Sequence, residues 1–175
     1  SSKNIKIIYI FSDQVYGEAE NHSEANEMLQ PLNKYGKTKF LGEQQIQNLC
    51  DDYLILRTNM FGWNVKLGRV SSAEWIYKTL KNHSEITLFT DYTFSPISTV
   101  CLGDIILKLV EIDSSGIINI GLSKPCSKYE FGLQLAEIFC LDKSFIKKGL
   151  MSDHSFSAHR SNKLDLDVKK IIEIG

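Results

Sequence analysis

The chain has 175 residues, 43% of them hydrophobic and 23% charged, so it is long enough to bury one sizeable core. Twenty Lys and Arg residues against 21 Asp and Glu residues give a formal net charge of −1, which argues against a nucleic-acid partner. The longest apolar run, Ile7 to Phe11, is far shorter than the roughly 20 residues of a membrane span. No signal peptide is recognised, so we expect a cytoplasmic protein without a membrane partner.

The predicted elements alternate between strands and helices. The β-branched run Ile5 to Phe11 predicts a strand that is buried on both faces. A helix is predicted over about residues 34–49, and Tyr53 to Thr58 predicts a second buried strand. Strand, helix and strand in this order build a parallel sheet with a right-handed crossover.

The same alternation continues along the rest of the chain. Ser71 with Glu74, and Ser127 with Glu130, have the spacing of a capping box, so each pair predicts the start of a helix. The other predicted elements are a helix over 99–112 and strands over 86–89 and 116–121. This pattern is typical of an α/β fold.

Several side chains receive structural interpretations. Trp75, Phe131 and Phe139 fall at helical core spacing, so we predict that they pack inside. Glu43 is expected on the solvent side of its helix. The four histidines lie in polar segments and are expected at the surface, and the four cysteines lack C-x-x-C spacing. We therefore expect free thiols and no metal site.

Tyr35 and Lys39 stand one helical turn apart in the segment LQPLNKYGKTKFLGEQ. Residues four apart on a helix project from the same face, with Cβ atoms about 6 Å apart. An ammonium that close favours a phenolate, so the pair could exchange a proton with a substrate oxygen near neutral pH. Ser12 and Asp13 follow the first strand directly, where open parallel sheets bind ligands. The Ser12 hydroxyl could hold the same oxygen, or the two residues could simply open a turn.

Five segments, taken in order, resemble one known family. They are SDQVYG, YGKTKFLGEQ, LILRTNMFG, SKYEFGLQLAEIF and RSNKLDLDVKKI. Together they are similar to the extended short-chain dehydrogenase/reductases, and within these to the dTDP-4-dehydrorhamnose reductase-like, sugar-nucleotide-binding branch. The glycine-rich segment G-x-x-G-x-x-G, which opens that family's fold and holds the cofactor pyrophosphate, does not occur in the sequence. We therefore expect a C-terminal portion that lacks the N-terminal, glycine-rich half of the fold.

The resemblance implies a fold in two regions. One is the C-terminal part of a Rossmann-type parallel sheet, and the other is a smaller α/β substrate-binding region. Residues 1–62 would form the catalytic half of the Rossmann domain, with residues 99–121 returning to it. Residues 63–98 and 122–175 would form the substrate-binding region.

The resemblance also implies a reaction, the NAD(P)-dependent reduction of a keto group on a nucleotide sugar. Ser12, Tyr35 and Lys39 match the catalytic residues, with Tyr35 as the proton donor. The implied cofactor contacts are Ser12, Tyr35, Lys39 and Asn59. The implied substrate contacts are Asp13, Asn59, Met60, Asp91, Ser95, Pro96 and Arg160.

Other functions of related proteins stay open at this point. Gln14 stands where the dehydratases of the superfamily carry a glutamate, and an amide cannot transfer protons, so we do not expect dehydration. A nucleotide-sugar epimerase uses the same three residues and keeps its cofactor bound. A regulatory subunit of the methionine adenosyltransferase type shares the fold without catalysis, although it has no chemical need for all three residues. The choice between NAD and NADP, and whether a homodimer forms, also stay open.

Overall fold

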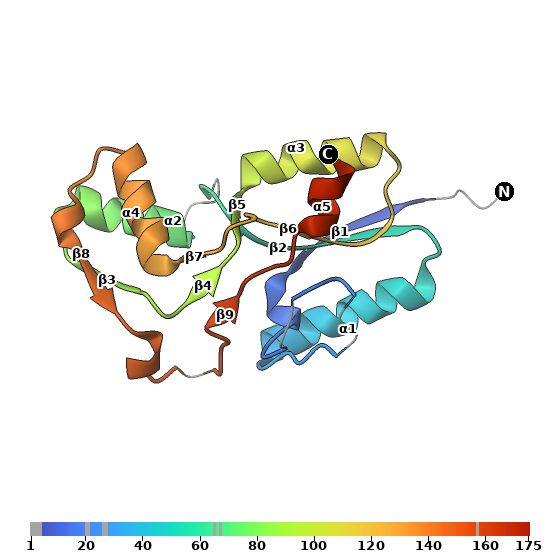
Figure 1. Cartoon of the computed structure of the whole chain (residues 1–175), viewed down its shortest axis with the longest axis horizontal. Helices are drawn as coiled ribbons and strands as arrows, with labels where there is room; N and C mark the ends of the chain where they lie inside the picture. The colour runs from blue at the N-terminus through green and yellow to red at the C-terminus, as the bar shows by residue number, and fades with distance from the viewer. Residues whose placement is uncertain (1–4, 20–21, 26–27, 65, 67, 157) are drawn as a thin grey trace.

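The computed structural model describes residues 5–19, 22–25, 28–64, 66, 68–156 and 158–175. Figure 1 shows two groups of elements side by side, one around a parallel sheet and one around short strands and two helices. The α/β fold class expected from the sequence is confirmed.

The larger sheet has parallel strands arranged around β2. Its strands are β1 (Ile7–Ser12), β2 (Tyr53–Phe61), β5 (Pro96–Ser98) and β6 (Gly116–Ile120). Strand β2 pairs with β1 on one side and with β6 on the other, and its last three residues pair with β5. Helix α1 (Lys34–Leu49) joins β1 to β2, so the predicted strand, helix and strand unit is confirmed.

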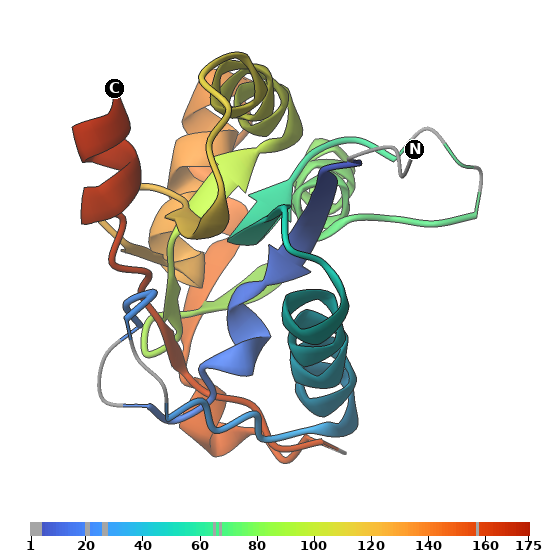
Figure 2. The ribbon, with the colours of Figure 1, turned by 90° about the vertical axis from the view of Figure 1, so that its right-hand side faces the viewer.

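Helices lie on both faces of this sheet. Figures 1 and 2 show α1 on one face and α3 (Thr99–Glu111) on the opposite face, with the short C-terminal helix α5 (Lys169–Ile174) beside β6. Leu54 and Leu56 of β2 pack in a cluster with Leu109 of α3, whereas Ile55 packs in a cluster with Phe11. Neighbouring residues of β2 therefore serve two cores, as the alternation of side chains along a strand requires.

The expected burial of the first strand on both faces is wrong. Ile7, Ile8 and Ile10 of β1 are 36%, 37% and 40% exposed. Within the described part of the chain, β1 pairs with β2 alone and so borders the sheet. A continuous apolar run indicates a strand that can be covered on both faces, but it does not report how many neighbours that strand has.

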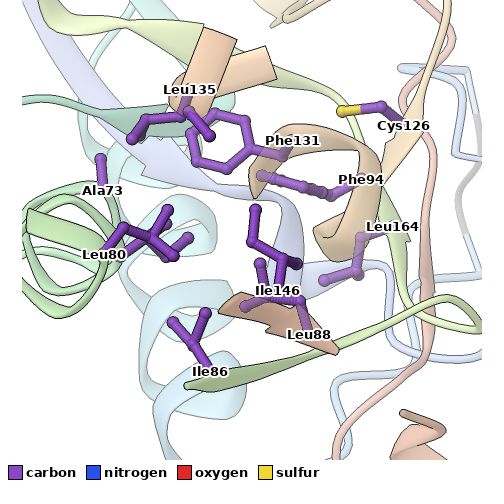
Figure 3. Packing of buried hydrophobic residues seen from close by; sticks show 12 residues of the cluster. Ala73, Leu80, Ile86, Leu88, Phe94, Cys126, Phe131, Leu135, Ile146 and Leu164 are labelled. Carbon is purple, nitrogen blue, oxygen red and sulfur yellow. The ribbon is translucent and has the colours of Figure 1, made fainter. Parts of the chain in front are cut away.

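The second group of elements surrounds a core of its own. It contains α2 (Ser72–Lys81), β3 (Ile86–Phe89), β4 (Thr93–Phe94), β7 (Cys126–Ser127), α4 (Lys128–Ile138), β8 (Ile146–Gly149) and β9 (Lys163–Leu164). Strand β3 pairs in parallel with β8, and β4 lies between β7 and β9. Figure 3 shows Phe94 and Phe131 packed with Leu80, Leu88 and Leu164 in this core.

The helix starts follow the local sequence signals. Both predicted capping boxes are present, at Ser71 with Glu74 and at Ser127 with Glu130. Helix α1 begins after Asn33, whose side chain accepts the Gly36 N–H at 2.9 Å. These caps are local, and the sequence alone therefore places the starts of α1, α2 and α4 well.

Two of the three predicted core aromatics are exposed instead. Phe131 is buried as predicted, but Trp75 and Phe139 are exposed. Helix α2 buries Ile76 and Leu80, and the position of Trp75 lies just outside that stripe. The ring of Phe139 rests edge-on against other aromatic rings at the surface rather than inside the core.

A buried polar network ties α1 to the sheet and overturns two surface predictions. Glu43 is buried, and it pairs with Arg57 of β2, whose Nε donates to Glu43 Oε2 at 3.1 Å and whose Nη2 contacts Oε1. Arg57 Nη1 also donates to the Tyr16 hydroxyl at 2.8 Å, which donates to Asn119 Oδ1 at 2.9 Å. The ring of His22 is buried and stacks on Tyr16, so this histidine is not at the surface.

The described residues also limit the kinds of site the fold contains. None of their helices is long and apolar enough to cross a membrane. They contain no group of three or more His, Cys, Asp or Glu side chains placed to hold a metal ion. The four cysteines are free thiols.

Candidate active site

The predicted catalytic residues lie at the carboxyl end of β1 and in the first part of α1. Ser12 ends β1, and its hydroxyl oxygen accepts the Gln14 N–H at 3.2 Å, which caps the 3-10 turn η1 (Asp13–Val15). Tyr35 is the second residue of α1 and is 56% exposed. The serine is therefore held by its turn, while the phenol is open to a ligand.

Gly36 allows α1 to lie directly against η1. A Cβ atom at this position would stand 2.7 Å from the carbonyl oxygen of Gln14, closer than such atoms approach. Tyr35 precedes this glycine, and Ser12 lies two residues before Gln14. The close contact of the two backbones therefore brings the turn that carries Tyr35 beside the turn that carries Ser12.

Lys39 lies among aromatic rings on the same side of α1 as Tyr35. Its Nζ is 5.7 Å from the ring centroid of Tyr35, 5.7 Å from that of Tyr9 and 5.6 Å from that of Phe11. Such rings attract an ammonium but leave its N–H groups without a strong acceptor. We find no hydrogen-bond acceptor for this ammonium among the described residues. The two side chains lie together as their spacing predicts, and their chemical roles stay predictions.

Asp13 is a buried carboxyl group beside Ser12. It is 1% exposed; Oδ1 accepts from the Ser12 hydroxyl at 3.3 Å and from Gln14 Nε2 at 3.5 Å, and Oδ2 accepts from Asn59 Nδ2 at 2.5 Å. Burial raises the pKa of Asp13 to about 6, because the hydrogen bonds and the charge of Lys128 offset only part of the cost of desolvation. Asp13 therefore titrates closer to neutrality than an ordinary aspartate.

A cleft of about 1040 Å³ opens between the start of α1 and the second group of elements. Its aromatic lining comes from Tyr35, Trp75, Phe89, Tyr92 and Phe156. Its cationic lining comes from Lys34, Lys37, Lys128 and Arg160. Among the lining residues that the structure describes there is no aspartate or glutamate. The cleft is thus basic although the whole chain is slightly acidic.

Two of the residues implied for substrate binding shape this cleft. Arg160 lines it directly, with its guanidinium 5.4 Å from the ring centroid of Phe156. The Asp91 carboxylate accepts the N–H groups of Met151 and Ser152, at 2.6 and 3.1 Å. It thereby holds the turn η3 (Met151–Asp153), and Met151 also lines the cleft.

The other implied substrate residues are not among those that line the cleft. Ser95 is fully buried, and its hydroxyl oxygen accepts the Leu166 N–H at 3.1 Å. Pro96 is buried at the start of β5. Strand β2 runs on to Phe61, so Asn59 and Met60 lie within this strand instead of after it. The structure therefore brings Ser12, Asp13 and Asn59 together by hydrogen bonds and leaves Ser95 and Pro96 in packing positions.

Lys128 is a candidate site residue that the sequence reasoning missed. It is the first residue of α4, lines the cleft, and has its Nζ 3.7 Å from the ring centroid of Phe94. Burial lowers the pKa of Lys128 to about 8, although the charge of Asp13 acts in the opposite direction. A cation in the first turn of a helix opposes the helix dipole. That mismatch in the segment SKYEF is the signal that could have identified Lys128.

The fold and the site at the strand ends define a Rossmann-like α/β protein, with a serine at a strand end and a tyrosine–lysine pair on the following helix. The family described as the RmlD substrate binding domain matches residues 1–175. The chain belongs to this family.

Curated relatives align with the chain at modest sequence identity. It is 26% identical over 172 residues to the probable low-salt glycan biosynthesis reductase Agl14 of Haloferax volcanii, covering 97% of the chain and 57% of the relative. It is 30% identical over 131 residues to the spore coat polysaccharide biosynthesis protein SpsK of Bacillus subtilis, covering 74% and 45%. It is 23% identical over 176 residues to methionine adenosyltransferase 2 subunit beta of Danio rerio, covering 97% and 54%. The chain thus spans about half the length of these relatives.

Solved structures support the same family. A dTDP-4-dehydrorhamnose reductase from Bacillus anthracis, in complex with NADP, matches with a TM-score of 0.85 at 24% identity, over 97% of this chain and 59% of that one. A dTDP-4-dehydrorhamnose reductase from Clostridium acetobutylicum matches with a TM-score of 0.84 at 26% identity, over the same shares. The resemblance to the dTDP-4-dehydrorhamnose reductase branch is therefore confirmed.

Proposed function

We propose that this chain carries the acid/base group and the substrate cleft of an enzyme that reduces a keto group on a nucleotide sugar. The cleft carries the proposal, because Tyr35 and four cationic side chains line it and its described lining has no carboxylate. A nucleotide sugar brings a diphosphate, whose negative charges such a lining attracts. The names of several relatives, a glycan biosynthesis reductase and dTDP-4-dehydrorhamnose reductases, point to the same class of reaction.

In this reaction Tyr35 donates a proton to the oxygen of the keto group. Lys39 stabilises the phenolate that remains, because its ammonium lies on the same side of α1. The Ser12 hydroxyl, which touches Asp13 in the free chain, turns to donate a hydrogen bond to the substrate oxygen. These donors act where negative charge develops, which is how such a site lowers the barrier.

The residues around Ser12 and Lys39 also suit a nicotinamide cofactor. The ammonium of Lys39 has no described hydrogen-bond acceptor, so its N–H groups are free to bind ribose hydroxyls. We propose NADP or NAD as the cofactor, held at this end by Ser12, Tyr35, Lys39 and Asn59. When bound, the nicotinamide supplies the hydride.

We propose that the two groups of elements divide this work. Residues 1–62 and 99–121 hold the cofactor and the acid/base group, and residues 63–98 and 122–175 bind the sugar nucleotide. The separate hydrophobic core of the second group, with the cleft between it and the start of α1, supports this division over most of the chain. Strand β5 and the C-terminal segment with Leu166, Val168 and α5 pack instead with the larger sheet. On the substrate side Arg160 contacts the ligand, while Asp91 acts by holding Met151 in the cleft wall.

The decisive test removes the Tyr35 hydroxyl. In the full-length protein, Tyr35→Phe should lower kcat for a dTDP-4-keto-6-deoxy sugar by about 100-fold or more, because general acid catalysis is worth that much. The loss of NADPH absorbance measures the rate. Tyr53→Phe, at the start of β2, is the matched control and should keep the wild-type rate. An unchanged kcat in Tyr35→Phe contradicts the mechanism.

The same assay separates two other functions. An epimerase returns its hydride to the sugar, so it changes the sugar without net consumption of NADPH; the chain is 40% identical to an ADP-L-glycero-D-manno-heptose-6-epimerase over 53 residues. A regulatory subunit turns over no sugar and copurifies with an enzyme. The 23% identity to a methionine adenosyltransferase subunit, over 97% of the chain, is the observation in favour of this second candidate.

A further inference from the structure

Lys128 presents hydrogen-bond donors to the cleft without an acceptor. Its Nζ lies 3.7 Å from the ring centroid of Phe94, 5.4 Å from that of Tyr92 and 5.9 Å from that of Phe131. Aromatic faces stabilise the charge of an ammonium but do not satisfy its three N–H groups. Among the described residues, no side chain or carbonyl group accepts a hydrogen bond from this ammonium or pairs with it. A largely desolvated donor of this kind needs an acceptor from a ligand.

The position of Lys128 relates it to the group that reacts. Lys128 and Tyr92 line the same cleft as Tyr35. The charge of Lys128 also acts on Asp13, whose carboxyl group accepts a hydrogen bond from Ser12. A ligand atom held by Lys128 therefore lies near the oxygen that Tyr35 protonates and not at a remote end of the cleft.

We infer that Lys128 donates a hydrogen bond to a hydroxyl oxygen of the substrate's sugar, so that it determines which sugars the cleft accepts. This inference rests on the proposed function and names a specificity-determining residue within it. The nearby charge of Asp13 opposes a diphosphate at this place, whereas it tolerates a neutral hydroxyl. The flanking ring of Tyr92 offers the apolar C–H face of a sugar a surface to pack on.

The remaining cations of the cleft leave the diphosphate a different place. Lys34 and Lys37 belong to the beginning of α1, and Arg160 belongs to the segment that precedes β9. All three are exposed, so they can follow a flexible diphosphate in water. The cleft thus has mobile cations for the charged part of a nucleotide sugar and one fixed cation, Lys128, for the sugar itself.

The test compares a nucleotide with its sugar conjugate. Calorimetric titration of the full-length protein with dTDP and with dTDP-glucose, and with UDP and UDP-glucose, gives affinities without turnover. We expect Lys128→Met to weaken binding of the glucose conjugate about tenfold or more and to leave binding of the free nucleotide unchanged. Lys128→Gln keeps a hydrogen-bond donor, so its affinity for the glucose conjugate should lie between that of wild type and that of Lys128→Met. Lys124→Met, at an exposed lysine four residues earlier, is the control and should change neither affinity.

Monodeoxy analogues of the glucose conjugate identify the hydroxyl. The analogue that lacks the contacted oxygen should bind wild-type protein as weakly as the complete conjugate binds Lys128→Met. Its affinity for Lys128→Met should be the same as its affinity for wild type. Equal losses for nucleotide and conjugate would place Lys128 at the diphosphate and overturn the inference, as would no loss for either. Wild-type protein that binds none of the four ligands overturns the proposed function itself, so the two failures are distinguishable.

Discussion

At the scale of single residues, Asp13 couples the site to pH. Its pKa of about 6 in the fold lies above the value near 4 of an unfolded chain. The folded chain therefore holds a proton that the unfolded chain releases between these values. The stability that Asp13 contributes is fully present below pH 4 and is lost as the pH rises through 6.

Replacing Asp13 should remove this dependence. The free energy of unfolding of wild type should fall from pH 4 to pH 7 by about 2 to 3 kcal/mol more than that of Asp13→Asn, as a pKa shift of about two units requires. Lys128, with a pKa of about 8, stays mainly protonated over this range. Urea denaturation at both pH values measures the difference. The exposed Asp51→Asn is the control, and parallel pH curves for wild type and Asp13→Asn would contradict the prediction.

The sequence predicts contacts between residues of one helix but not contacts between residues of different elements. Tyr35 and Lys39 are neighbours by helix geometry, so their proximity follows from spacing alone. Glu43 has its partner Arg57 on another element, and nothing in the spacing of α1 reveals that partner. Lys128 was missed for the same kind of reason, because Asp13 and the ring of Phe94 reach it from distant segments.

At the scale of elements, the contact between α1 and η1 assembles the site. Gly36→Ala introduces a Cβ at 2.7 Å from the Gln14 carbonyl oxygen, so α1 must shift away from η1 and take Tyr35 with it. Because a misplacement of about 1 Å can cost about 100-fold in rate, we expect kcat to fall by tens of times or more. The sugar reductase assay measures this loss. Thermal unfolding should change less, since alanine favours a helix over glycine by about 1 kcal/mol.

Gly42 provides a matched control within the same helix. A Cβ at this position would meet only the Tyr9 hydroxyl, at 3.5 Å, an ordinary contact. Gly42→Ala should therefore keep the wild-type kcat and gain up to about 1 kcal/mol in stability. Equal activity in the two alanine variants would mean that the contact of Gly36 does not position Tyr35.

The elements that sequence reasoning found and missed differ in length and in the origin of their signals. The starts of helices α1, α2 and α4 are indicated by their N-cap residues Asn33, Ser71 and Ser127, whose side chains bond to nearby backbone N–H groups. Strands β4, β7 and β9 have two residues each, too few to show an alternating pattern. They exist because distant segments pair, so local sequence carries no sign of them.

At the scale of the whole molecule, β1 presents an open edge. Ile8 and Ile10 are exposed, and within the described residues β1 has one paired neighbour. An apolar, unpaired strand is a template for another chain. We expect the 175-residue chain to self-associate in sedimentation velocity as its concentration rises. Ile8→Lys combined with Ile10→Lys should shift it to monomer.

The control for this prediction lies on a helix. Val100 of α3 is more exposed than either isoleucine, at 73%, but belongs to no strand edge. Val100→Lys should leave the association unchanged if the edge of β1 drives it. A wild-type chain that stays monomeric at all concentrations contradicts the prediction, and so does an equal effect of the helix substitution.

The basic lining of the cleft has a kinetic consequence. A formal net charge of −1 repels anions weakly at long range, yet four cations line the cleft and no aspartate or glutamate is among its described lining residues. An anion therefore meets an attractive field only after it comes within about 8 Å, the distance over which physiological salt screens charges. Capture at the mouth, more than attraction from afar, then governs how fast a charged ligand associates, and added salt slows that step. The net charge of a chain can thus differ in sign from the charge of its binding site.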